Sequence, residues 1–234
     1  MKSNIGPSSL ISYVSFTLIF FIIKNKFKLP GTSWIWFFLI ASGILQFINN
    51  LYITNYPEIC GTYNTSSAIT ATLVPWICIF GITCLCLTNI PGWLRVFSNT
   101  FGSTVASMAG INEIVSKVFE KTKDSGTKTS DTTIIEATNL LYANRNKFIN
   151  EINMDFTQDP SSNKIEWPSL FAIMDFMGIS IVGKDAEIKK LHEMLELKED
   201  AGYFLWMIII GSISILISTN SLILSSCSSV EFNM

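Results

Sequence analysis

Four long apolar runs, each bordered by polar residues, divide the chain. They cover 8–23, 33–53, 67–87 and 203–224. Because about 20 helical residues cross the ~30 Å hydrocarbon layer of a bilayer, the last three runs are long enough to span it. A signal peptide is the competing interpretation of the shorter first run, but three lysines at 24–28 follow it instead of a small-residue cleavage site. The pattern predicts an all-α protein with about four transmembrane helices.

The charged residues gather between the third and fourth runs. The segment 98–202 holds 27 of the 34 charged side chains, with 11 Lys and Arg against 16 Asp and Glu, a net charge of −5. We therefore predict a three-span membrane region over 1–97, an acidic and mostly helical domain over 98–202, and a fourth span with a short tail over 203–234. Because acidic surfaces repel phosphate, we expect protein partners for the domain and no nucleic acid.

Helical periodicity recurs within this acidic segment. An apolar face over 101–119 predicts a helix that either lies on the membrane or packs on its neighbours. A capping-box pattern at Thr133 predicts a second helix over 133–156. The apolar run 170–182 is too short to span and predicts either a buried core or a re-entrant piece. The charged helix over 184–199 leads into the fourth span, broken only by Gly202, and predicts a stalk.

Basic residues in short loops predict the orientation of the spans. The loop 24–28 carries three lysines, whereas 55–66 carries Glu58 and no base. Because basic loops stay cytoplasmic, we expect both termini and 55–66 outside, and 95–202 inside. Cys60 and Cys227 then share the outer face, where either a disulfide or two free thiols is expected. Asn64 begins an N-glycosylation pattern in the same loop.

Small and polar residues inside the spans suggest helix contacts. In lipid, small residues let helices approach closely, and the fourth span carries such a stripe at Gly211, Ser214, Ser218 and Ser221. On the second span, Gln46, Asn49 and Asn50 share one face. These amides either contact another helix or lie at the headgroups. Four residues are expected to anchor at the membrane interface: Trp34, Trp36, Trp93 and Arg95.

Catalytic and metal-binding patterns are not found. Cys78, Cys84 and Cys86 have no accompanying ligands and are interpreted as buried apolar residues. The single histidine, His192, lies in a charged helix and is interpreted as a solvated residue. No span contains Asp, Glu, Lys, Arg or His, which argues against a pump or coupled transporter. We expect neither enzyme activity nor a cofactor.

The stretch Pro91-Gly92-Trp93-Leu94-Arg95-Val96-Phe97-Ser98-Asn99-Thr100-Phe101-Gly102 lies where the third span leaves the membrane. With its flanks, over 76–119, it resembles a membrane protein of nucleocytoplasmic large DNA viruses, the algal and amoebal giant-virus group. The resemblance implies a structural protein of the virion's internal membrane, derived from the host endoplasmic reticulum. It also implies that the acidic domain faces the capsid and binds a minor capsid protein, that Trp93 anchors at the interface, that Arg95 pairs with phosphate, and that Gly92 and Gly102 permit a turn.

Two functions from different classes follow from these observations. The leading hypothesis is a structural protein that anchors an internal viral membrane to the capsid shell through 98–202. The alternative is a small channel or permeation subunit lined by the amide face of the second span. The expected partners are the lipid bilayer and capsid or other membrane proteins, and self-association stays open.

Overall fold

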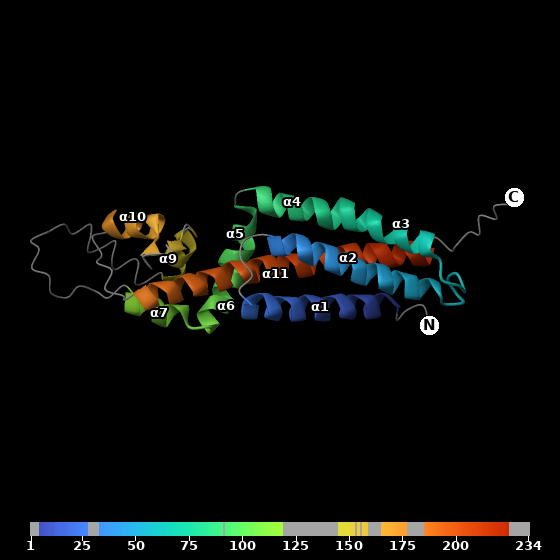
Figure 1. Cartoon of the computed structure of the whole chain (residues 1–234), viewed down its shortest axis with the longest axis horizontal. Helices are drawn as coiled ribbons and strands as arrows, with labels where there is room; N and C mark the ends of the chain where they lie inside the picture. Colours follow the sequence, from blue (N-terminus) through green and yellow to red (C-terminus); the bar gives the residue numbers. More distant parts are fainter. Residues whose placement is uncertain are drawn as a thin grey trace, which may run out of the picture. The chain divides into compact units, whose positions relative to one another are not determined.

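The computed structural model describes residues 5–27, 33–90, 92–118, 145–152, 154, 156–158, 165–176 and 185–224. The chain divides into two compact units. Unit 1 comprises Met1–Leu94 and Tyr203–Met234, and unit 2 comprises Arg95–Gly202. Figure 1 shows that the described elements are almost all helices. The prediction of an all-α, multi-span protein is confirmed.

Unit 1 is a bundle of four spans. The first two are α1 (Ile5–Phe27) and α2 (Ser33–Thr54). The third is one continuous helix made of α3 (Thr65–Pro75), the π-helical η2 (Trp76–Gly81) and α4 (Ile82–Asn89). The fourth is the apolar part of α11 (Asp185–Leu224). All four helices are long and apolar enough to cross a bilayer, including the first, so the chain is an integral membrane protein.

Interlocking aromatic rings form the centre of this bundle. Trp76 meets Tyr13 and Phe80 edge to face, with ring centroids 6.3 and 5.0 Å apart. The indole Nε1 of Trp76 donates to the Leu39 carbonyl at 3.0 Å. Gly43 makes room for this ring, because a Cβ there would lie 2.9 Å from the indole nitrogen. Aromatic packing thus joins the first three spans, while large apolar side chains elsewhere face outward, as lipid contact requires.

Unit 2 is built from short elements around the first part of α11. These are α5 (Trp93–Phe97), which begins in unit 1, η3 (Ser98–Gly102), α6 (Ser103–Met108), α7 (Ile111–Val118), α9 (Arg145–Glu151), β1 (Thr157–Gln158), β2 (Ile165–Glu166) and α10 (Pro168–Phe176). The two strands pair antiparallel, with Thr157 opposite Glu166. The most buried apolar side chains of its core include Val115, Ile149, Trp167, Leu170 and Leu191.

The helix expected over 101–119 is divided in two. α6 ends at Met108 and α7 begins at Ile111, because Gly110 adopts a φ of +98° that other residues rarely adopt. Ile111 and Val118 are buried in unit 2, whereas Val105 and Met108 are exposed. The prediction of one continuous helix was therefore wrong, and of the residues expected on its apolar face only those of the second half pack in the core of unit 2.

The expected break at Gly202 is also absent, since α11 continues through that residue. Its first half is no stalk, because Ile188, Leu191 and Leu195 are buried in the core of unit 2. Gly202 permits close packing, because a Cβ there would lie 2.8 Å from the Ser98 backbone nitrogen. Gly102 is likewise helical and would overlap the Lys198 carbonyl if it carried a Cβ.

Other expectations for this region are only partly described. Gly92 has a φ of +88° and makes the turn expected of it. The capping box at Thr133 and the end of the run 170–182 lie outside the described residues. Within the described part, Leu170 is buried and Asp175 is exposed.

Candidate functional site

The small-residue face of α11 meets α1 closely at Gly211. The Tyr13 hydroxyl donates to the Met207 carbonyl at 2.7 Å, beside the glycine. A Cβ at position 211 would overlap this hydroxyl. Glycine is therefore required for the approach of the two helices, as packing of small residues in membranes predicts.

The remaining members of the stripe differ in their surroundings. Ser214 and Ser218 are buried, and Ser214 Oγ donates to the Ile210 carbonyl at 3.0 Å. Ser221 is exposed. Ser221 follows Ser218 by three residues, which is about 60° short of a full helical turn. Residue 222 is four residues after Ser218 and faces the packed side, where Leu222 is buried.

A buried hydrogen-bonded network, here called the polar seam, joins all four spans. Gln46 Nε2 donates to Asn50 Oδ1 at 3.0 Å, and Asn50 Nδ2 donates to Thr72 Oγ1 and Ser218 Oγ, both at 2.8 Å. Longer contacts of 3.3–3.4 Å join Gln46 to three hydroxyls. The seam consists of Ser9, Gln46, Asn50, Thr72, Ser218 and Thr219.

The seam shows how the amides of the second span are satisfied. An unpaired polar group in hydrocarbon costs several kcal/mol, and Gln46 and Asn50 avoid this cost by contacting other helices. The third amide, Asn49, is half-buried, and its Nδ2 has no hydrogen-bond partner among the described residues. The sequence did not single out Thr72, because a threonine hydroxyl can also bond its own helix, as this one does to Ala68.

The residues expected at the membrane interface divide into buried and exposed ones. Trp34 is buried at the end of the bundle, edge to face with Tyr203 at 5.6 Å, and Lys24 Nζ lies 5.4 Å from its ring centroid. Trp36 is exposed, as an anchor in lipid would be. Trp34 is buried because its side of α2 meets Phe20 of α1 and Tyr203 of α11, and its role as an interface anchor stays a prediction.

The exit from the third span holds the other two expected anchors. Trp93 is half-buried and contacts Trp206 edge to face, with ring centroids 5.6 Å apart. Arg95 is exposed at the start of unit 2. Trp93 therefore packs on the first turns of the fourth span, which places aromatic rings at the end of the bundle where interfacial residues are usual.

The cysteines fall into two groups. Cys60 is disulfide-bonded, whereas Cys78, Cys84 and Cys86 are free. Cys227 lies outside the described residues, so its pairing with Cys60 stays a prediction. Among the described residues, no group of three or more His, Cys, Asp or Glu side chains is placed to hold a metal ion.

His192 is half-buried beside two aromatic rings, so it is less solvated than expected. Its ring stacks on Phe156 at 4.1 Å and meets Trp167 edge to face at 5.6 Å. Burial lowers the pKa of His192, while the carboxylates of Glu196 and Glu193 oppose the shift. A neutral imidazole is thus favoured. Its ring contacts connect α11 to Phe156 and Trp167, which flank the paired strands β1 and β2.

A buried lysine lies beside the close glycine contacts of unit 2. Lys198 Nζ donates to Asn99 Oδ1 at 2.8 Å, which joins α11 to η3. Burial lowers the pKa of Lys198 to about 8, partly opposed by the negative charge of Glu199. Burial in turn raises the pKa of Glu199. These groups stabilise a helix crossing.

Comparisons with known proteins add no relative. The chain matches no protein-family model, no curated protein and no solved structure. Its function therefore has to be argued from the seam, the helix contacts and the acidic unit.

Proposed function

We propose that this chain is a structural membrane protein that anchors a membrane to a proteinaceous shell through unit 2. The observation that carries the proposal is that the single helix α11 takes part in both units. The same helix contributes Leu191 and Leu195 to the core of unit 2, and Gly211 and Ser218 to the contacts of the bundle. A helix shared by both cores suits a protein that must hold an extramembrane unit to a bilayer.

The polar side chains of the spans support an anchoring function more than a transport function. The amides of Gln46 and Asn50, which would have to line a channel, bond instead to neighbouring helices. A hollow of about 400 Å³ lies between Gly6, Pro7 and the last turns of α11, and apolar side chains dominate its lining. Neither feature supplies the polar path that the alternative function, a channel, requires.

The proposed location is the internal membrane of a large DNA virus, derived from the endoplasmic reticulum, with unit 2 facing the capsid. The support is the resemblance over 76–119 together with the net charge of −5 over 98–202. Exposed carboxylates at Glu113, Glu151 and Asp175 would steer a basic partner, such as a minor capsid protein, because surface charge governs encounter and specificity.

Cross-linking of native particles tests this proposal directly. An amine-reactive cross-linker should join the exposed lysines of unit 2, Lys117, Lys147 and Lys189, to a shell protein. Lys26, which is exposed near the end of the first span, serves as the internal control and should link mainly to membrane neighbours. Cross-links from unit 2 only to membrane proteins, or isolation of the chain from a membrane without a shell, would contradict the proposal.

Two deletions separate attachment from insertion. Removing 133–183 takes away Trp167 and Leu170 from the core of unit 2, so it should abolish shell attachment while the chain still inserts. Removing 121–131 is the matched control and should preserve attachment. Because the larger deletion disturbs folding, Glu151→Lys with Asp175→Lys tests the surface alone and should weaken attachment. Normal attachment in both test variants would refute the anchor, and ion conductance by the reconstituted wild-type chain would favour the channel.

A further inference from the structure

The first helical segment of unit 2 presents an apolar face that the unit leaves uncovered. The side chains of Val96, Phe101, Val105 and Met108 are 63%, 57%, 37% and 86% exposed. On the opposite side, Ser98, Gly102 and Ala106 are buried. The segment from α5 to α6 is therefore amphipathic, with its inner side made of small residues and its outer side of large apolar ones.

The π-helical turn keeps this face in register. In η3 the Ser103 N–H reaches the Ser98 carbonyl, five residues back, instead of four. Val96 and Phe101, five residues apart, thus stay on one side across the wider turn. Val105 and Met108 then follow at the spacings of four and three that an ordinary helix aligns.

The polar groups beside this face are satisfied internally. Thr100 Oγ1 donates to the Val96 carbonyl at 2.7 Å, and Thr104 Oγ1 donates to the Thr100 carbonyl at 3.1 Å. Both hydroxyls are therefore bonded without water. Although the unit is acidic, no Asp or Glu occurs in the sequence from 89 to 112, and Arg95 is the only charged residue there.

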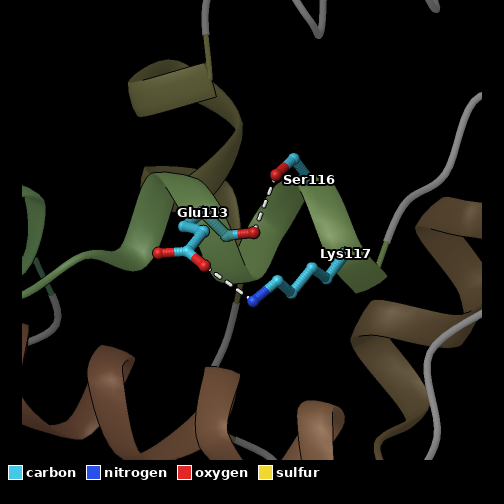
Figure 2. Close-up of polar contacts among 3 residues, drawn as sticks. All are labelled: Glu113, Ser116 and Lys117. Carbon is cyan, nitrogen blue, oxygen red and sulfur yellow. Dashed lines mark hydrogen bonds and ion pairs between the residues drawn. The ribbon is translucent and has the colours of Figure 1, made fainter.

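The next helix has a different surface, which Figure 2 shows. On α7, Lys117 Nζ and Glu113 Oε1 form an ion pair of 2.6 Å, and both side chains are mostly exposed. Ser116 Oγ donates to the Glu113 carbonyl at 2.7 Å on the same helix. The positive φ of Gly110 separates this charged surface from the apolar face before it.

We propose that the face formed by Val96, Phe101, Val105 and Met108 lies in the bilayer surface, in the boundary between headgroups and acyl chains. The occupant is lipid because the face continues a lipid-facing surface along the chain. The third span ends at Asn89, and seven residues reach at most about 25 Å. Helices with one apolar face and few charges on it bind at this depth, and Gly110 then turns the chain toward water.

The depth of a single label tests the proposal in the full chain. Cys78, Cys84 and Cys86 are replaced by Ala, and an environment-sensitive fluorophore is attached through Met108→Cys or, as the water-facing control, Lys117→Cys. The parent without either added cysteine measures background labelling. Each chain is placed as one copy per lipid nanodisc, so that a second copy is absent.

The label at 108 should show blue-shifted emission, loss of emission with phosphatidylcholine brominated on its acyl chains, and little quenching by aqueous iodide. The label at 117 should show the reverse. Equal iodide quenching at both positions would overturn the proposal, because the face would then lie in water. Protection of position 108 from iodide without quenching by bromolipid would also overturn it, because protein would then cover the face.

Discussion

Replacement of Gly211 by alanine should loosen the bundle, although alanine is the better helix former. A Cβ at 211 would overlap the hydroxyl and Cζ of Tyr13 and would lie 2.8 Å from its Cε1. The ring must move, and its 2.7 Å hydrogen bond to the Met207 carbonyl is then lost. A loss of stability on Gly211→Ala therefore indicates a packed glycine, whereas a gain would indicate a glycine that faces lipid.

The magnitude follows from three contributions. Loss of a hydrogen bond between spans costs about 0.6–2 kcal/mol, and overpacking a closely packed contact costs about 1–3 kcal/mol. Replacing glycine by alanine in a helix contributes about 1 kcal/mol in the opposite direction. We expect Gly211→Ala to lower the free energy of unfolding by about 1–4 kcal/mol. Tyr13→Phe removes only the hydroxyl and should cost about 0.6–2 kcal/mol.

Reversible unfolding in mixed micelles with increasing dodecyl sulfate, followed by tryptophan fluorescence, measures these changes. Gly6→Ala is the matched control, because nothing lies within 4 Å of a Cβ at that position. In a Tyr13→Ala background, Gly211→Ala should become neutral or stabilising, because the overlapping ring is gone. A single Gly211→Ala variant as stable as the wild type, or more stable, would refute the contact.

Three further predictions use other parts of the chain. Peptide mapping without reduction should find Cys60 joined to Cys227, and recovery of both as alkylated peptides would contradict the pairing. A membrane-impermeant thiol reagent should modify Tyr63→Cys in intact vesicles but Lys147→Cys only after permeabilisation, and the reverse pattern would overturn the topology. The folded-state pKa of His192 lies below its ordinary value of 6.5, so the folded state binds fewer protons and its stability is lost as pH falls from 6.5 toward that lower pKa. The protection of unit 2 against hydrogen exchange, corrected for the pH dependence of intrinsic exchange, should fall as the pH is lowered from about 7.5 to about 5, and His192→Gln should remove most of this change. An unchanged pH dependence in that variant would show that another group is responsible.

The spans could be predicted from the sequence because their cause is local. Each apolar run is long enough for a bilayer, and lipid provides the same solvent to every residue of the run. Even the start of the third span has a local signal, since Asn64 caps α3 by accepting from the Ser67 N–H at 3.0 Å.

The arrangement of unit 2 could not be predicted, because its causes are contacts between distant residues. Gly110 and Gly202 look alike in the sequence, yet one ends a helix with a positive φ and the other lies inside a helix against Ser98. His192 has charged neighbours in sequence, whereas Phe156 and Trp167 surround it in space. Helical periodicity does not distinguish these cases.

Small residues at two places on α11 connect the fold to the proposed function. Gly202 approaches Ser98 in unit 2, and Gly211 approaches Tyr13 in unit 1. An anchor depends on both contacts, because each fixes the same helix within one of the two cores. A channel would depend instead on the amides of Gln46 and Asn50, which here serve as bonds between spans. Both close contacts are ones that an anchor would need, and they support the proposed anchor over the channel.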